Sequence, residues 1–327
     1  MHTPTTILLT GATSQIGLGL ARALSARGDR VRCLVRSPKK ADLLAGLAVE
    51  KVAGDLDAPE SLGPALAGVD AVFHVAGLAS YWSRRFDEVR RANVDGTRRL
   101  LDAARAAGVR RVVLTSSIVT LGPVAGDGHG DETAPQREQG IPYYDAKLAA
   151  ERMVLGARDV EGVAVNPGII VGGDDLKGNG AKLLLPLVRG TLRAVPPGAV
   201  TLSVLDDVVA GHVAALDRGR PGERYVLGGT TGTYREVFAR IAAALGRPAP
   251  RWVLGPAALA LAGAAQELAA AVTGREPDLT RQLAATMCWN RRFRSDKAAR
   301  ELGYAPRPLE DGVEACRRWY EARGELR

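Results

Sequence analysis

Residues 5–24, which read TTILLTGATSQIGLGLARAL, decide the fold of this 327-residue chain. An apolar strand leads into a glycine turn and then into a helix. Gly11 allows the tight turn and Gly17 lets the helix pack close to the sheet, so the free N–H groups at the helix start can face a diphosphate. Ser14 stands where a third glycine is expected; its Cβ would crowd the phosphates at a cost of at most about 1 kcal/mol, and its hydroxyl could donate to a phosphate oxygen. The turn residues predicted to contact such a cofactor are Gly11, Thr13, Ser14, Gln15, Ile16 and Gly17.

Beyond the turn, short apolar runs alternate with amphipathic helical stretches through the first half of the chain. Continuous apolar strands separated by helices predict a parallel sheet covered on both faces. After Gly168 the alternation stops, and the last third is mostly helical. We therefore expect an α/β fold, a Rossmann-type doubly wound parallel sheet with a smaller, mostly helical C-terminal substrate lobe. The expected strands are 6–9, 31–35, 49–54, 71–76, 111–117 and 162–168; the nucleotide domain covers 1–168 with 200–228 returning to it, and the substrate lobe covers 169–199 and 229–327.

Charge and cysteine usage narrow the class of protein. The net charge is +8, but the basic residues are scattered and form no block with interleaved aromatics, so we expect no nucleic-acid partner. The three cysteines, Cys33, Cys288 and Cys316, lack metal or redox spacing and suit a reducing cytoplasm. The four histidines are dispersed, and no metal site is expected.

One stretch, 256–272 (PAALALAGAAQELAAAV), is apolar enough to raise the question of a membrane. Gln266 and Glu267 interrupt it, and the start of the chain does not read as a signal peptide. The stretch therefore predicts a helix packed inside the protein rather than an integral membrane segment, with a position against a membrane or an apolar substrate as the alternative, and we expect a cytoplasmic protein.

The end of the second predicted strand bears on the choice of cofactor. A carboxylate there would favour NAD, but this strand ends in Arg36, with Lys39 and Lys40 close behind. Cations suit a 2′-phosphate and predict a preference for NADP(H) over NAD(H), although a solvated charge cluster is the alternative interpretation. Further cofactor contacts are expected where the third and fourth strands end, at Asp55, Leu56, Val75, Ala76 and Gly77.

A catalytic group is indicated by YYDAK. Tyr143 and Lys147 are four residues apart, so on a helix they share a face, one turn from each other. The ammonium is expected to lower the pKa of the phenol, which can then exchange a proton with a carbinol oxygen. Ser117, at the end of the fifth predicted strand, would hold that oxygen beside the phenol. Tyr144 has Leu148 four residues later, so it does not fit this role.

These residues carry a resemblance. From TGATSQIG through FHVAG, VVLTSS and YYDAK to SDKAARELGYAPRP, the chain resembles the extended short-chain dehydrogenases/reductases of the NAD-dependent epimerase/dehydratase superfamily. It is most similar to the branch of dihydroflavonol reductases, 3β-hydroxysteroid dehydrogenases and hopanoid-associated epimerase-like proteins. The resemblance implies a homodimer, formed through the helices that carry Tyr143 and Asn93. It also implies Ser117, Tyr143, Lys147 and Asn93 as catalytic residues, and Ser116, Tyr143, Lys147, Asn166, Pro167, Gly168 and Ile169 at the cofactor.

Three functions are compatible with this sequence. The first is an NADP(H)-dependent oxidoreductase that transfers hydride between nicotinamide and a ketone or secondary alcohol of an apolar small molecule, cyclic ones included. Apolar runs at 77–82 and 183–188 indicate that substrate class, with Tyr81, Trp82, Ser117 and Ile118 as candidate contacts. The second is a nucleotide-sugar epimerase or dehydratase with tightly bound NAD(P). The third, a non-catalytic dinucleotide sensor, would not need to keep Ser117, Tyr143 and Lys147.

Overall fold

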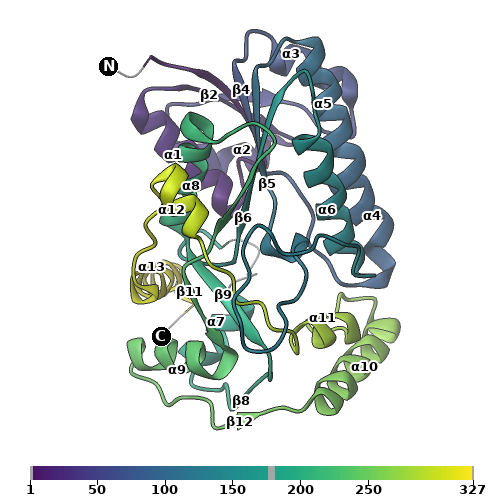
Figure 1. Cartoon of the computed structure of the whole chain (residues 1–327), viewed down its shortest axis with the longest axis vertical. Coiled ribbons are helices and arrows are strands. Elements are labelled where there is room, and N and C mark those ends of the chain that lie inside the picture. The colour runs from purple at the N-terminus through teal and green to yellow at the C-terminus, as the bar shows by residue number, and fades with distance from the viewer. Residues whose placement is uncertain (1–2, 176–180, 326–327) are drawn as a thin grey trace.

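A seven-stranded parallel sheet forms the larger part of the molecule (Figure 1). This computed structural model describes residues 3–175 and 181–325, without the side chains of 181–184. The strand order is β10-β6-β5-β4-β1-β2-β3, so the chain builds outward from β1 first to one side and then to the other. The predicted Rossmann-type sheet is confirmed. Its strands are β1 (Thr6–Thr10), β2 (Arg30–Val35), β3 (Glu50–Ala53), β4 (Ala71–His74), β5 (Arg111–Thr115), β6 (Glu161–Pro167) and β10 (Arg224–Leu227).

Helices cover both faces of this sheet, which explains why its strands are apolar without alternation. Side chains of a strand point alternately to opposite faces. Ile7 and Leu9 pack into one core and Leu8 into the other, and all three are fully buried. The first core is closed by α1 (Gln15–Arg27), α8 (Leu205–Arg218) and α12 (Asp296–Leu302), and the second by α3 (Leu62–Leu66), α5 (Gly96–Ala106) and α6 (Pro142–Leu155).

A smaller sheet lies beyond the carboxyl end of the large one, with the strand order β11-β9-β7 (Figure 1). Its strands are β7 (Ile169–Val171), β9 (Ala199–Val204) and β11 (Thr230–Thr233). Helices α9 (Tyr234–Ala244) and α13 (Leu309–Ala322) pack on it around Phe238 and Tyr320. The two-residue strands β8 (Ala194–Val195) and β12 (Trp252–Val253) pair beside it. The remaining α-helices are α2 (Pro38–Ala41), α4 (Phe86–Arg90), α7 (Ala181–Val188), α10 (Pro256–Thr273) and α11 (Arg281–Thr286). The expected boundary between the domains stays a prediction.

Helix α10 corrects one expectation. Only 17% of it is buried, so the prediction of a helix packed inside the protein is wrong. Leu261, Leu268 and Val272 are 72%, 71% and 86% exposed. Among the described residues, α10 is the one helix whose length and mean hydropathy, 1.2, would allow it to cross a membrane. Gln266 and Glu267 do not break the helix, because both bond to the protein beneath it.

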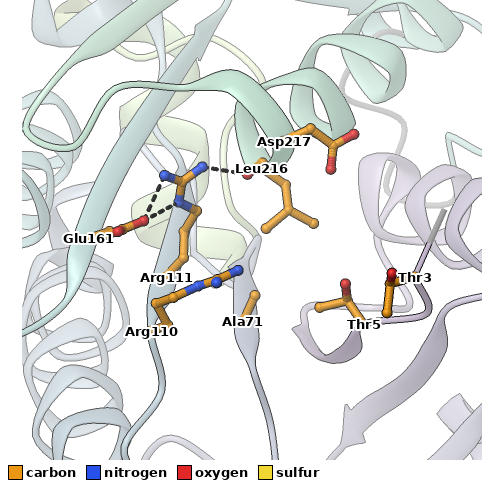
Figure 2. A pocket seen from close by; sticks show the side chains of 8 residues that line it. All are labelled: Thr3, Thr5, Ala71, Arg110, Arg111, Glu161, Leu216 and Asp217. Carbon is orange, nitrogen blue, oxygen red and sulfur yellow. Dashed lines mark hydrogen bonds and ion pairs between the residues drawn. The ribbon is translucent and has the colours of Figure 1, made fainter. Parts of the chain in front are cut away.

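A surface hollow of about 380 Å³ opens at the amino end of the large sheet, near Thr5, Ala71 and Arg111 (Figure 2). Arg111 spans it, donating to Glu161 at 2.8 Å and to the carbonyl of Leu216 at 2.5 Å. Parallel α/β sheets bind their ligands at the carboxyl ends of the strands. The hollow lies at the opposite end of the strands from the predicted site residues.

Candidate active site

The glycine turn between β1 and α1 leaves no room for a side chain. Gly11 has a φ of +69°, and a Cβ there would lie 2.6 Å from the backbone nitrogen of Ala76. A Cβ on Gly17 would lie 2.1 Å from the carbonyl oxygen of Gly11. Both distances are far below van der Waals contact, so the turn can close only with glycine at these positions. The tight turn predicted for Gly11 agrees with this geometry, whereas the close contacts of Gly17 are with Gly11 and Ala12 of the turn itself.

Ser14 is the N-cap of α1. Its Oγ accepts a hydrogen bond of 3.1 Å from the backbone N–H of Gly17. The cap uses a lone pair and leaves the hydroxyl hydrogen free, so donation to a phosphate stays a prediction. Thr13 and Ile16 are half-buried beside it. The side chain of Gln15 turns away from the turn and donates to the carbonyl of Gly173 at 2.8 Å.

The other predicted cofactor residues line the carboxyl edge of the sheet around this turn. Arg36 directly follows β2, Lys40 lies in α2, and both are exposed. No ion pair is recorded for either within residues 3–175 and 181–325. Asp55 follows β3, where its carboxylate accepts from the backbone N–H of Asp57 at 3.1 Å. Next to it Leu56 is half-buried, and after β4 come Val75, Ala76 and Gly77, of which Ala76 donates its N–H to Thr10 at 3.3 Å.

Lys147 comes from α6 and reaches the end of the sheet. It is buried, and its Nζ donates to the carbonyl of Thr115 at 2.7 Å. A Cβ on Gly77 would lie 3.6 Å from this Nζ and 2.7 Å from Oδ1 of Asn93. The structure thus brings Lys147, Gly77 and Asn93 to one point at the carboxyl edge.

Tyr143 and Ser117 lie near this point. Tyr143 is half-buried on α6, one turn before Lys147. Ser117 is half-buried too; its Oγ accepts from the N–H of Val119 at 3.3 Å and caps the turn Ile118–Thr120, which packs against α6. Ile118 itself is 4% exposed and packs into a small core with Phe293, which leaves its side chain little surface for a substrate.

The electrostatics of the pair differ from the sequence-based expectation. Burial, and secondarily the neighbouring Tyr144, raise the pKa of Tyr143 above its ordinary value, whereas a lowered pKa was expected. Burial also lowers the pKa of Lys147 to about 8, against the opposite influence of Glu151. Removal from water is the largest cause of the shift for each of the two groups.

Tyr144 belongs to a cluster of aromatic side chains, with Tyr81 and Trp289, beside Tyr143. It is buried, and its hydroxyl accepts from that of Tyr81 at 3.3 Å. Arg291 lies over the Tyr144 ring at 4.7 Å and over Trp289 at 5.0 Å. The Tyr81 ring also meets that of Tyr143 edge-on, with centroids 5.8 Å apart. Tyr81 thus lies next to the candidate acid, while Trp82 is half-buried under the guanidinium of Arg84 at 5.4 Å.

Asn93 is buried in a single π-helical turn, Arg91–Asp95. Its amide donates to the carbonyls of Leu78 at 2.8 Å and Val89 at 2.9 Å, and its Oδ1 accepts from the N–H of Leu78 at 3.2 Å. Such turns are frequent at functional sites. The side chain holds the loop that leads from Gly77 to Tyr81.

Glu151, which sequence reasoning missed, is fully buried one turn after Lys147. Four side chains donate to its carboxylate, those of Ser116, Thr120 at 2.9 Å, Gln136 at 2.6 Å and Asn166 at 2.7 Å, and Arg224 forms an ion pair at 3.0 Å. Its spacing of four residues from Lys147 could have indicated that it lies beside the ammonium. Its hydrogen-bond partners come from distant parts of the chain, so the sequence did not reveal them.

This network occupies the side chains of two residues that were predicted to contact the cofactor. The side chains of Ser116 and Asn166 point to Glu151, so a contact with a cofactor would come from their backbone. Asn166 also donates to the carbonyl of Ser117 at 3.1 Å, which connects Glu151 to the candidate catalytic serine. Pro167 ends β6, and Gly168 and Ile169 lead into β7, with the N–H of Gly168 donating to Ser203 at 3.1 Å.

A second link missed from the sequence joins the loop of Tyr81 to the segment after α10. Ser80 donates to Glu276 at 2.5 Å, and Arg85 donates to the other oxygen of Glu276 at 2.9 Å. The loop beside the candidate acid is therefore anchored to the small lobe.

Known proteins resemble this chain over most of its length. The sequence profile described as "NAD dependent epimerase/dehydratase family" matches residues 7–228. "Sterol demethylase protein B" of Methylococcus capsulatus is 38% identical over 256 residues, 77% of this chain and 78% of that protein. The "putative dihydroflavonol 4-reductase" of Synechocystis sp. is 31% identical and covers 98% of this chain and 95% of its own. The crystal structure of gox2253 superposes with a TM-score of 0.85 at 35% identity, covering 99% of this chain and 100% of that one.

Proposed function

The chain belongs to the NAD-dependent epimerase/dehydratase family, as an extended short-chain dehydrogenase/reductase, and we propose that it is an NADP(H)-dependent reductase of apolar ketones. Membership makes it an NAD(P)-dependent oxidoreductase. The observation that carries the finer proposal is the half-buried phenol of Tyr143, one turn from the buried Lys147, at the carboxyl edge beside the glycine turn.

The residues present fit a dinucleotide. Gly11 and Gly17 let the turn fold so tightly that a Cβ at either position would clash with the backbone, and the start of α1 beyond the turn offers N–H groups that suit a diphosphate. Arg36 and Lys40 would hold a 2′-phosphate, and Lys147 would hold the ribose next to the nicotinamide. A bound nicotinamide supplies or accepts the hydride.

The protein's own groups then handle the proton. Because burial keeps the pKa of Tyr143 high, its phenol is protonated at neutral pH and can donate to a carbonyl oxygen that gains negative charge. Ser117 would donate a hydrogen bond to the same oxygen, and the positive Lys147 stabilises the phenolate that remains. The protonated phenol is the form that the reduction of a ketone requires.

The half-buried rings of Tyr81 and Trp82 support an apolar substrate. The relatives named for a sterol and a dihydroflavonol agree with a cyclic, mostly apolar molecule. We also propose that the protein is a homodimer and that it is cytoplasmic.

The test is NADPH oxidation with a panel of cyclic ketones by wild type, Tyr143→Phe and Tyr144→Phe. We expect Tyr143→Phe to lose about a hundredfold or more in kcat, while Tyr144→Phe stays within a few-fold. Equal losses would remove Tyr143 from its role. Tightly retained NAD, together with conversion of UDP-sugars and no ketone turnover, would favour an epimerase or dehydratase instead.

Cofactor preference is tested separately with Arg36→Ala. Removing a charge-assisted bond to a phosphate should raise the KM for NADPH about tenfold and leave that for NADH unchanged. Arg30→Ala, at the opposite end of the same strand, is the matched control. Tighter binding of NADH than of NADPH by the wild type would refute the preference.

A further inference from the structure

Helix α10 presents its apolar side to the surface of the molecule. Leu261, Leu268 and Val272 follow one another at spacings of seven and four, so they share one side of the helix. All three are more than two-thirds exposed, and the exposed residues between them include Ala265 and Ala271. Glu267 is the one charged residue of the helix. Contiguous apolar surface of this kind marks an interaction site.

The other side of α10 is fastened to the protein by polar contacts. Glu267 accepts from the N–H of Arg281 at 2.9 Å and forms an ion pair with its guanidinium at 2.7 Å. Gln266 accepts from the N–H of Leu279 at 3.0 Å. Gly263 packs so closely that a Cβ would lie 2.8 Å from the backbone of Arg281. Crossing a bilayer would break all of these contacts, whereas lying flat on its surface would keep them.

Arginines and a tryptophan lie at the same end of the molecule. The backbone N–H groups of Arg251 and Trp252 donate to the carbonyl of Arg193 at 3.0 and 3.2 Å, in the β8–β12 pair that leads into α10 (Figure 1). Trp252 is 67% exposed. Arg193, Arg247 and Arg251 are exposed as well, and no ion pair is recorded for them among the described residues. Apolar, aromatic and arginine side chains together are the composition of interfacial membrane helices.

We propose that α10 and the β8–β12 pair dock flat on an anionic lipid bilayer. A second copy of the chain fits less well, because a two-fold contact would bring the arginines of one copy against those of the other. An anionic headgroup layer would attract these arginines while Leu261, Leu268 and Trp252 enter the acyl boundary.

The docked face connects to the candidate active site. Glu276, three residues after α10, holds Ser80 and Arg85 of the loop that carries Tyr81. If the proposed reduction of apolar ketones is right, this face would place the substrate loop at the source of its substrate. The docking itself rests on the surface and not on the reaction.

The experiment is flotation of the full-length protein with vesicles of phosphatidylcholine alone and of phosphatidylcholine mixed with phosphatidylglycerol. We expect binding to the anionic vesicles, weakened by high salt. Leu261→Ser with Leu268→Ser should lower the partition coefficient about tenfold or more, and Arg193→Gln with Arg251→Gln should also lower it. The matched controls are Leu43→Ser, an exposed leucine on the large domain, and Arg300→Gln, an exposed arginine of α12. Binding needs no turnover, so the result is separate from the hydride-transfer proposal.

Several outcomes would overturn the proposal. These are no flotation with anionic vesicles, equal losses in the α10 and Leu43 variants, or wild-type protein that resists carbonate extraction and therefore spans the bilayer. A wild type that does not float, but whose mass by light scattering halves in the Leu261/Leu268 variant, would assign the face to a second copy.

Discussion

At the scale of single residues, the chemistry of the site depends on the ionisable side chains that are buried on α6. Lys147 and Glu151 are both buried on this helix, and Tyr143 stands half-buried at its start. Their spacing of four places the three side chains along one side of the helix. Glu151 favours the protonated form of Lys147, and pH is the most direct probe of the charges on this helix.

The first prediction concerns the pH dependence of reduction. Burial lowers the pKa of Lys147 from 10.5 to about 8, so the ammonium is lost as the pH rises through 8. We expect kcat/KM for ketone reduction to be flat below this pH and to fall above it. The sign for stability is opposite, because the unfolded chain binds the proton more tightly: the free energy of unfolding rises between about pH 8 and 10.5. Lys147→Met should abolish that rise in denaturant titrations, and an unchanged rise would contradict the assignment.

The second prediction concerns Glu151. Glu151→Gln keeps the size of the side chain but removes the charge that favours protonated Lys147. The alkaline fall of kcat/KM should move to lower pH, and stability should drop by about 3 kcal/mol because Arg224 loses its buried partner. Glu301→Gln, which removes the carboxylate that Arg220 and Tyr225 contact, is the control and should leave the pH profile alone. A folded Glu151→Gln protein with the wild-type profile would refute the role.

At the scale of elements, helix ends and helix faces matter more than helix propensity. Helix α1 begins where the serine of the glycine turn caps it. Helix α10 has its polar residues toward the protein and its apolar residues outward, the reverse of an ordinary surface helix. In both cases one or two polar side chains decide what the element presents to its surroundings.

The third prediction separates capping from phosphate binding at Ser14. Ser14→Ala removes the cap of α1 and should cost about 1 kcal/mol of stability, whereas Ser14→Gly should cost only a few tenths. Urea unfolding measures the difference between them. If the hydroxyl also donates to a phosphate, Ser14→Ala should bind NADPH more weakly than the wild type, and Ser14→Gly should lose less because it also removes the Cβ that crowds the phosphates. Equal stability of the Ala variant and the wild type would show that the cap contributes nothing.

At the scale of the whole molecule, the candidate site joins two lobes that different parts of the chain build. The large sheet supplies the glycine turn and α6, and the small lobe supplies Glu276 and Arg291. The loop that leads from Gly77 to Tyr81 lies between them, held by Asn93 on one side and by Glu276 on the other.

The fourth prediction tests this junction with Glu276→Gln. The Arg85–Glu276 pair is partly exposed, so its loss should change stability by less than about 1 kcal/mol. The freed loop should raise the KM for a cyclic ketone several-fold while the KM for NADPH stays the same. Glu88→Gln removes the other partner of Arg85 and is the control. A raised KM for NADPH, or an unchanged KM for the ketone, would contradict the loop's role.

The sequence alone determined the Rossmann sheet, the glycine turn and the family, because these follow from residues close together in the chain. Apolar runs, the Gly11–Gly17 spacing and the Tyr143–Lys147 spacing all act within one or two turns or strands. The strand predicted over 111–117 ends at Thr115, and the side chain of Ser116 donates to Glu151, a residue 35 positions away.

Tertiary structure decided what depends on distant partners. The carboxylate of Glu151 collects donors from Gln136 and Asn166 and a cation from Arg224, and no spacing reveals that set. The pKa of Tyr143 rises because of burial, which only packing fixes, and secondarily because Tyr144 lies next to it. The exposed apolar side of α10 also depends on distant partners, because Gln266 and Glu267 accept from Leu279 and Arg281 and so turn their side of the helix toward the protein.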